Sequence, residues 1–390
     1  MLRTRPTSPR SPRRLFGASV DEWRDWRWQE RHVVHGAQAL AAHLALSEDE
    51  REGITRASFP ASATPYYLSL ADRDDPWCPV RRQIVPSTAE TRRGRGELAD
   101  PLGEDRDMPV PGLVHRYPDR VLFLATSRCS AYCRHCTRRR RTGAPGASAG
   151  ALERAAAYVR AHREVRDVLV SGGDPLLLPT AHLTRVLRAF RSIPHVEILR
   201  VGTRMPVTNP FRVTGELVAA LRRLAPLFVI THFNHPKEVT AQARAACEAL
   251  VDGGIPVENQ TVLLRRLNSS SRILGDLFRR LLTMRVRPYY LHQMDVAQGL
   301  EHLRTPLEEG VAILAALRGT ISGLAIPHLA VDLPGGGGKV TLQPDYLVSL
   351  DARQAVLRNG RGKTYRYPQP VERDCSCPYE STFYGSSEVR

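Results

Sequence analysis

A short apolar run and three closely spaced cysteines follow one another in residues 121–137, which read VLFLATSRCSAYCRHCT. Val121–Ala125 has the composition of a buried strand. The loop after it holds Cys129, Cys133 and Cys136 in the spacing C-x3-C-x2-C. Thiolates this close together can face one inorganic centre, and they fall one short of the ligand set of tetrahedral zinc or an ordinary [4Fe–4S] cluster. A cluster held here would keep one iron open to an external ligand, which indicates catalysis. A zinc site completed by His135 is the structural alternative.

The chain around this loop alternates between short apolar runs and helical patterns. The predicted strands are Val121–Ala125, Val168–Ser171, Val196–Val201, Leu227–Thr231, Val257–Leu264 and Val286–Leu291. The predicted helices are Ala151–Glu164, Ala181–Arg191, Thr214–Arg223, Glu238–Val251, Arg272–Met284 and Leu307–Leu317. Strands that alternate with helices predict an α/β fold with a parallel sheet and right-handed crossovers. These units are too few for a closed eightfold barrel, which leaves a partial (β/α)6 barrel or a doubly wound sheet. In both, catalytic residues lie at the carboxyl ends of the strands.

The rest of the chain is organised around this core, for which we expect residues 113–325. Residues 1–19 are a basic tail that we expect to be disordered, because residues 1–14 are rich in Arg, Ser and Pro and contain no acid. Residues 20–112 are expected to form an N-terminal helical region, with Ser47 as a helix N-cap, and then an extended connection over Asp72–Pro111. Residues 326–390 are expected to form a glycine-rich lysine loop and a C-terminal extension.

The composition excludes several classes of protein. Of the 390 residues 42% are hydrophobic and 25% charged, which is typical of a globular protein, and no apolar run is long enough to cross a membrane. The formal net charge of +16 raises the possibility of nucleic-acid binding. The cations, however, are almost all arginines scattered through every segment, which disfavours a nucleic-acid site; the lysines are Lys237, Lys339 and Lys363. The chain has seven cysteines, an odd number, and we see no signal-peptide pattern. Both observations argue against a secreted protein with disulfide bonds and predict a reducing compartment, the cytoplasm. We expect Cys78 and Cys247 to be buried or incidental.

A second strong pattern is AVDLPGGGGK, residues 330–339. Four glycines remove every Cβ from the loop, so its backbone can approach a flat ligand closely. Lys339 follows directly and suits a Schiff base with pyridoxal phosphate if its pKa is lowered. A flexible loop with a solvated lysine is the alternative. A P-loop is excluded, because the pattern lacks G-x4-G-K-[ST] after a strand.

Together the two patterns resemble the lysine 2,3-aminomutase family, radical S-adenosylmethionine enzymes that also use pyridoxal 5′-phosphate. The resemblance covers Tyr66 to Cys377 and includes HRYPDR at 115–120, CRHCTRRR at 133–140, THFNHP at 231–236 and RPYY at 287–290. It implies a radical S-adenosylmethionine core with a [4Fe–4S] cluster on Cys129, Cys133 and Cys136, S-adenosylmethionine on the open iron and pyridoxal phosphate on Lys339. The implied reaction moves the α-amino group of L-lysine to C3, which gives β-lysine.

The resemblance also implies roles for polar residues near these groups. Arg116 and Arg120 would hold the cofactor phosphate, although Arg120 could instead pair only with Asp119. Arg138 would bind the substrate carboxylate, whereas Arg139–Arg141 are expected to be a solvated basic run. The stretch Ser171-Gly172-Gly173-Asp174 would hold the methionyl amino group. His232 and Gln260 would lie near the nucleoside or the cofactor.

Two acids decide the expected substrate. Asp295 and Asp332 match positions at which lysine-specific members bind the ε-ammonium group, and paired anions favour a buried cation. Glutamate is therefore disfavoured. Arginine stays open as a substrate that would give β-arginine, because a guanidinium also satisfies two carboxylates. A turn cap is the structural alternative for Asp332.

One departure from the family concerns zinc. Members close a structural zinc site with four cysteines, of which Cys375 and Cys377 are present, whereas Glu380 and Ser270 replace the others. We therefore expect no structural zinc. The expected partners are a small amino-acid substrate, a one-electron reductant such as flavodoxin or ferredoxin, and further copies of the chain, with no membrane. The alternative of a different class is a basic Fe–S or zinc protein that binds or modifies RNA.

Overall fold

The structure is a computed structural model that describes residues 15–143 and 150–372. It divides into two compact units, Met1–Gln343 and Pro344–Arg390. Most of the expected basic tail, and the zinc-related Cys375, Cys377 and Glu380, lie outside the described residues. Within the described ranges, every helix is too short or too polar to cross a bilayer.

The larger unit is built on a nine-stranded sheet of the order β11-β10-β9-β8-β7-β6-β5-β4-β3. Its strands are β3 (Leu113–Tyr117), β4 (Arg120–Thr126), β5 (Asp167–Gly172), β6 (Ile198–Gly202), β7 (Leu227–Thr231), β8 (Val257–Leu263), β9 (Arg287–Gln293), β10 (His328–Asp332) and β11 (Lys339–Leu342). The strands β4 to β10 run parallel, and β3 and β11 are antiparallel at the two edges. In the described part of the chain the edge strands do not pair with each other, so the sheet is open.

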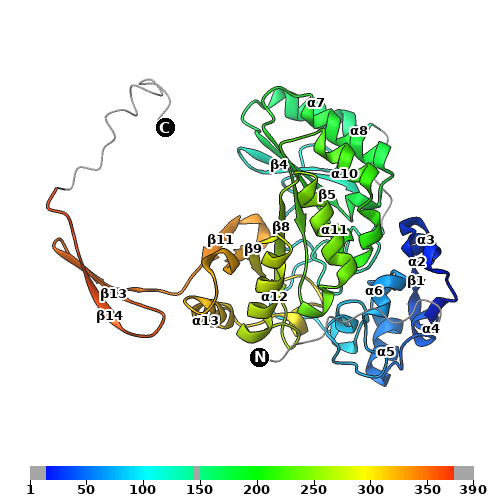
Figure 1. Cartoon of the computed structure of the whole chain (residues 1–390), viewed down its shortest axis with the longest axis horizontal. Coiled ribbons are helices and arrows are strands. Elements are labelled where there is room, and N and C mark those ends of the chain that lie inside the picture. The colour runs from blue at the N-terminus through cyan, green and yellow to red at the C-terminus, as the bar shows by residue number, and fades with distance from the viewer. Residues whose placement is uncertain (1–14, 144–149, 373–390) are drawn as a thin grey trace. The chain divides into compact units, whose positions relative to one another are not determined.

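Helices connect the parallel strands and lie along one side of the sheet (Figure 1). They are α7 (Ala151–Ala161), α8 (Thr180–Arg191), α10 (Gly215–Arg222), α11 (Ala241–Asp252), α12 (Ser271–Thr283) and α13 (Leu307–Leu317). Each expected strand and helix is present, which confirms the α/β prediction and its β–α units. The strands β10 and β11 were not predicted. They add a seventh parallel strand and a hairpin that carries the glycine run as its turn.

Alternation along the strands separates a packed face from a polar face. On β4, Val121 and Phe123 are buried in the core with the helices, whereas Arg120 and Leu122 are partly exposed on the other face. The same period of two holds on β6, β8 and β9, where the partly exposed face carries Arg200, Gln260, Val262, Tyr290 and His292. Because a strand sends successive side chains to opposite faces, one face packs and the other is left to form a site.

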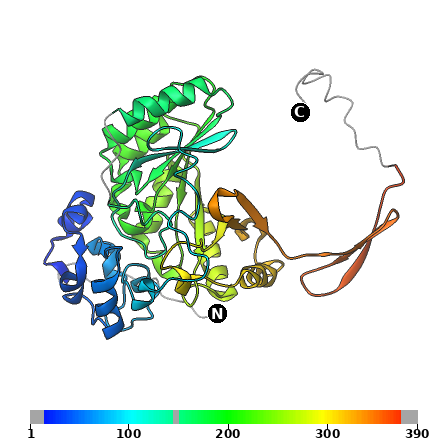
Figure 2. The same cartoon turned by 180° about the vertical axis from the view of Figure 1, so that it is seen from behind.

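The N-terminal region forms a group of short helices beside the core (Figure 2). They include α2 (Val20–Arg24), α3 (Trp26–Arg31), α4 (Gly36–Ala41), α5 (Glu48–Arg56) and α6 (Pro65–Ser69). Ser47 caps α5 in a capping box with Glu50, as predicted.

Residues 72–111 are not the extended connection that we expected. Their buried arginine Arg81 pairs with Glu50 at 2.5 Å, and their buried Glu90 pairs with Arg134 at 2.5 Å. This segment is therefore fixed to both the N-terminal helices and the cysteine loop. The reason is tertiary, because charged residues that look solvated in the sequence find buried partners far along the chain.

The smaller unit contains a three-stranded antiparallel sheet of the order β12-β13-β14. Its strands are β12 (Leu347–Leu350), β13 (Gln354–Arg358) and β14 (Thr364–Pro368). Leu347, Leu350, Tyr365 and Tyr367 are exposed on it. The sequence did not predict this sheet.

Candidate active site

A cavity of about 570 Å³ opens on the polar face of the large sheet. Its walls come from the ends of most strands, from the cysteine loop and from the segment before β3. Eight of the residues singled out in the sequence line it together: Arg116, Arg120, Arg138, His232, Gln260, Asp295, Asp332 and Lys339.

Lys339 and Asp332 form one side of this cavity. They are directly opposite each other on β11 and β10, and Lys339 Nζ lies 2.6 Å from Asp332 Oδ2. Lys339 Nζ is also 3.3 Å from His292 Nδ1 and 5.2 Å from the centre of the Tyr290 ring. The lysine is therefore not a solvated loop residue, and Asp332 ends a strand and is not a turn cap.

The glycine run is the turn that makes this pair possible. Gly335, Gly336 and Gly338 have φ values of 69°, 84° and 86°, a region that side-chain-bearing residues rarely adopt. The turn reverses the chain within the six residues 333–338, so that residues 332 and 339 become cross-strand neighbours. The glycines thus serve the hairpin that presents Lys339.

Electrostatics distinguishes the two acids of the cavity. Burial raises the pKa of Asp295 to about 6, because its hydrogen bond from Thr137 and the nearby cations offset only part of the desolvation. Burial also acts on Asp332, but the hydrogen bond from His292 and the charge of Lys339 lower its pKa to about 2. Burial lowers the pKa of His292, so its ring is neutral at pH 7. Asp332 is thus firmly ionised, while Asp295 titrates close to the physiological range.

The cysteine loop reaches the same cavity. Thr137, which directly follows Cys136, donates a hydrogen bond from Oγ1 to Asp295 Oδ2 at 2.5 Å. The next residue, Arg138, forms an ion pair with Glu104 at 2.7 Å. His135, Thr137 and Arg138 all line the cavity. The end of the cysteine loop and the lysine hairpin therefore face one space.

The chemistry of the three thiols fits an iron–sulfur cluster. Burial and the neighbouring cysteines raise the pKa of Cys129 and of Cys136, so thiolates here need a positive partner such as iron. Arg204 Nη1 donates to Cys133 Sγ at 2.7 Å. None of the five cysteines among the described residues is in a disulfide. Cys78 and Cys247 are buried, as predicted.

The stretch Ser171-Gly172-Gly173-Asp174 supports the cysteine loop from behind. A Cβ on Gly172 would lie 2.3 Å from Thr126 O, and one on Gly173 would lie 2.2 Å from Arg128 O. The buried Asp174 carboxylate accepts hydrogen bonds from Leu176 N, Thr203 Oγ1 and Arg204 N. These four residues do not line the cavity around Lys339, although they pack against the loop that does.

The two arginines expected at the cofactor phosphate both line the cavity and both have acidic neighbours. Arg116 Nε lies 2.8 Å from Asp107 Oδ2. Arg120 pairs with Asp119 at 2.9 Å and stacks over the Tyr117 ring at 3.9 Å. The alternative noted for Arg120, a pair with Asp119, therefore coexists with its place in the cavity.

The expectation of a solvated run at Arg139–Arg141 was wrong. Arg139 pairs with Glu90 at 2.5 Å, Arg140 pairs with Asp100 at 2.9 Å, and Arg141 pairs with Asp105. The acids come from the segment before β3, which folds back over the cysteine loop. A basic run looks solvated in the sequence when its acidic partners lie tens of residues away.

Several residues that line the cavity or pair with its lining were not found from the sequence. Glu104, which lines it beside Arg138, and Asp107, which pairs with Arg116, lie in a Pro-rich and charged segment without periodicity. His292 and the pair Arg200–Asp167, at 2.9 Å, lie on the polar face of the sheet. The alternation along β5, β6 and β9 is the signal that could have identified the last three.

Comparisons with known proteins agree with this geometry. The family model described as "Radical SAM superfamily" matches residues 123–273, and the one described as "Lysine-2,3-aminomutase" matches residues 314–387. The chain is 47% identical to an L-lysine 2,3-aminomutase of Fusobacterium nucleatum over 90% of this chain and 83% of that protein. It is 45% identical to an L-lysine 2,3-aminomutase of Clostridium subterminale over 91% and 86%. It is 37% identical to a glutamate 2,3-aminomutase of Clostridioides difficile over 90% and 84%.

Proposed function

The chain belongs to the lysine 2,3-aminomutase family of radical S-adenosylmethionine isomerases, and on that premise we propose that it interconverts L-lysine and β-lysine. The family implies a [4Fe–4S] cluster and S-adenosylmethionine. We further propose that pyridoxal 5′-phosphate binds to Lys339. The observation that carries the choice of lysine is the pair of carboxylates, Asp295 and Asp332, in the cavity that contains Lys339.

The two carboxylates favour a cationic substrate over an anionic one. A lysine side chain would bring an ammonium group to Asp332, which is ionised, and to Asp295, which a nearby cation would ionise. A glutamate side chain would bring a third carboxylate to the same place, where like charges repel. Arginine is the second candidate, since a guanidinium can pair with two carboxylates as well. The aminomutase relatives include both lysine-named and glutamate-named proteins, so membership of the family does not by itself decide the substrate.

The chain supplies residues for each bound group. We assign Cys129, Cys133 and Cys136 to the cluster, and Arg116 and Arg120 to the phosphate of pyridoxal phosphate. When bound, S-adenosylmethionine on the cluster supplies a carbon radical, and pyridoxal phosphate supplies a conjugated system for the migrating amino group. Ser171, Gly172, Gly173 and Asp174 fix the cysteine loop, and we assign them to the S-adenosylmethionine side of the site with His232 and Gln260. Burial lowers the pKa of His232 to about 3, so it acts as a neutral hydrogen-bonding group.

Two polar side chains flank Lys339 Nζ. Asp332 Oδ2 at 2.6 Å stabilises the charged ammonium group, and His292 Nδ1 lies 3.3 Å from the same nitrogen. If Lys339 held pyridoxal phosphate, Asp332 would lie beside Nζ and in the same cavity as a bound substrate, so this carboxylate would be placed to stabilise a cation on either of them.

Arg138 is assigned to the α-carboxylate of the substrate. Its Nε and Nη2 atoms face Glu104 at 2.8 and 2.7 Å, which fixes the plane of the guanidinium. Charge-assisted bonds from a fixed guanidinium orient a carboxylate well. Glu104 is therefore a positioning residue for Arg138.

Anaerobic incubation of reconstituted protein with lysine, arginine and glutamate in separate reactions tests the proposal. Mass spectrometry after derivatisation should show β-lysine as the main product. β-Arginine as the faster product would move the substrate assignment to arginine, and β-glutamate would contradict the role of the two acids. Strong, salt-dependent binding of RNA with no turnover would favour the alternative class.

The remaining proposals concern the surroundings of the enzyme. We propose a cytoplasmic, homo-oligomeric protein that receives electrons from a flavodoxin or a ferredoxin and holds no structural zinc. The replacement of two family cysteines by Ser270 and Glu380 supports the last point. Metal analysis of the purified protein, with zinc below iron by at least tenfold, is the expected result.

A further inference from the structure

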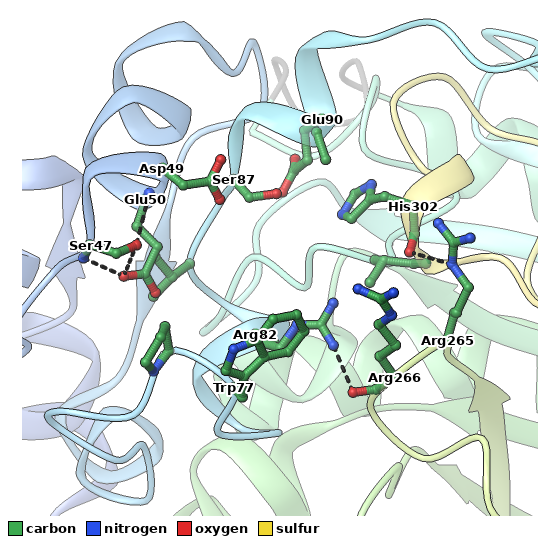
Figure 3. Close-up of a pocket in the computed structure, with 14 residues that line it drawn as sticks. Ser47, Asp49, Glu50, Trp77, Arg82, Ser87, Glu90, Arg265, Arg266 and His302 are labelled. Carbon is green, nitrogen blue, oxygen red and sulfur yellow. Dashed lines mark hydrogen bonds between the residues drawn. The ribbon is translucent and has the colours of Figure 1, made fainter.

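A second hollow, of about 420 Å³, lies between the N-terminal helical region and the loops after β8 and β9 (Figure 3). Neither the sequence patterns nor the proposed reaction uses it. The hollow is lined by Arg82, Arg265 and Arg266, with Trp77 and His302, and we refer to it as the basic hollow. A neighbouring hollow shares Arg265 and His302 with it and adds Arg92 and Arg304, of which Arg304 pairs with Glu301.

The three arginines of the basic hollow have no acidic partner. Within residues 15–143 and 150–372, none of Arg82, Arg265 and Arg266 is in an ion pair; Arg82 and Arg266 lie over the Trp77 ring. Arg82 Nη1 instead donates to Arg266 O at 2.7 Å, and Arg265 Nε donates to His302 O at 3.1 Å. Burial and the neighbouring charges of Arg266 and Arg265 lower the pKa of Arg82, as expected for cations that repel one another.

The acids that line the hollow do not neutralise these arginines. Both oxygen atoms of Glu50 are bonded to Arg81, at 2.7 and 2.5 Å. Glu90 is held by Arg134 and Arg139, each at 2.5 Å. Asp49 accepts hydrogen bonds from Thr88 and is in no ion pair among the described residues, so it keeps its negative charge. The three arginines therefore carry positive charge that no ion pair neutralises, and Asp49 is the acid of the lining that is not held by another arginine.

Two further features point to a ligand. The Trp77 side chain is 56% exposed and lies beneath Arg82, whose guanidinium is 5.0 Å from its ring centre. The His302 ring points toward the hollow in Figure 3, and its buried Nδ1 has no hydrogen-bond partner among the described residues. An exposed tryptophan and unpaired arginines are the residue types most enriched at protein interfaces.

The basic hollow lies directly behind the cysteine loop. Arg134, between Cys133 and Cys136, donates its backbone N–H to Gln83 O at 2.8 Å, next to Arg82. Its guanidinium pairs at 2.5 Å with Glu90, which lines the hollow. His135 and Thr137 of the same loop line the substrate cavity. The cysteine loop thus separates two hollows, one for the substrate and one that is basic.

We propose that the basic hollow is the docking site of a small acidic one-electron carrier protein that reduces the cluster. This inference rests on the proposed function, which requires an electron for each radical that is formed. The carrier loses one electron and the cluster gains it; no bond forms or breaks and no proton moves. The route from the hollow to Cys133 consists of the Glu90–Arg134 ion pair and one peptide step.

The test compares two reductants on the same protein. The variant R265E/R266E reverses two exposed charges of the hollow, and the control R163E/R185E makes the same change in net charge at exposed positions on or next to α7 and α8. Cluster reduction is followed by absorbance, first with dithionite and then with flavodoxin that has been reduced and freed of excess dithionite. The affinity for flavodoxin is measured separately by calorimetry at low and high salt.

For R265E/R266E we expect the ratio of the flavodoxin rate to the dithionite rate to fall at least tenfold, and the affinity for flavodoxin to fall by a similar factor. The control should keep both values within about twofold of the wild type. An unchanged ratio in R265E/R266E, or an equal fall in the control, would overturn the inference. The readout is reduction of the cluster and does not require turnover. The test of the docking site therefore remains valid even if the aminomutase assay shows no activity. The conservative variant R265K/R266K should retain most of the rate.

Discussion

Lys339 Nζ lies 2.6 Å from Asp332 Oδ2, and the two residues are cross-strand partners next to the turn of one hairpin. The relationship joins two roles that the sequence left separate, since Lys339 was expected to hold a cofactor and Asp332 a substrate. Both side chains line the cavity that also contains Asp295, so the residue that we assign to the cofactor and the two that we assign to the substrate share one space.

Two of the three lysines of the chain, Lys339 and Lys363, provide a matched test of the cofactor site. Lys339→Ala should abolish turnover and the visible absorption band of lysine-bound pyridoxal phosphate, because no other amine lines the cavity described here. Lys363→Ala, on an exposed turn of the smaller unit, should leave both unchanged. Absorption spectra and a β-lysine assay measure the two effects. A normal absorption band in Lys339→Ala would overturn the assignment.

Asp332→Asn should reduce kcat/KM for lysine by roughly 100-fold or more, since truncating one member of a buried charge pair costs about 2–5 kcal/mol. Lysine would lose an ionised partner, and Lys339 would lose the group that fixes its ammonium. Glu308→Gln, at an exposed position in the first turn of α13, is the control and should be neutral. Steady-state kinetics that showed full lysine activity in Asp332→Asn would exclude a role in substrate binding.

Because of Asp295, kcat/KM for lysine should depend on pH. Its pKa of about 6 is above the ordinary value of 3.8, so the carboxylate is increasingly neutral below pH 6 and ionised above it. Because the ionised form binds an ammonium group, kcat/KM for lysine should fall as the pH drops through 6. Profiles from about pH 5 to about pH 8 should show this step in the wild type and lack it in Asp295→Asn. An identical step in the variant would assign it to another group.

Gly173 should be needed for the cluster although it does not line the cavity around Lys339. A Cβ at this position would lie 2.2 Å from Arg128 O, so Gly173→Ala has to displace the cysteine loop, at a cost of about 1–3 kcal/mol. Iron analysis should then show less than half of the wild-type iron per chain. Gly215→Ala is the control, because a Cβ there meets no atom within 4 Å. Full iron content in Gly173→Ala would show that the loop tolerates the shift.

The parallel core could be predicted because buried apolar residues alternate with partly exposed ones along its strands and because its helices are amphipathic. Val121 and Phe123, for example, have the spacing of a strand and pack as one. The cysteine spacing and the glycine–lysine pattern identified a loop whose residues His135, Thr137 and Arg138 line the cavity and a hairpin that presents Lys339 to it. Local patterns are enough for these elements, because each is defined by neighbours within a few residues.

The elements and residues that the sequence did not predict depend on partners that lie far along the chain. The strands β10 and β11 are short and flank a glycine run that reads as a loop, so only their pairing shows them to be strands. Glu90, Glu104 and Asp107 lie in a segment without periodicity, and their partners Arg134, Arg138 and Arg116 are set by the tertiary fold. The basic hollow has the same origin, because Arg82 and Arg266 lie far apart in the sequence.

Transfer of hydrogen between substrate and cofactor tests most directly whether the cysteine loop and Lys339 act on one cavity. Reduced protein would be incubated anaerobically with S-adenosylmethionine and with lysine that carries deuterium at C3, and both small molecules would then be analysed by mass spectrometry. We predict β-lysine together with deuterium in the 5′-deoxyadenosyl part of S-adenosylmethionine. Cleavage of S-adenosylmethionine without deuterium transfer to that part would show that the radical and the substrate do not meet, and would contradict the account.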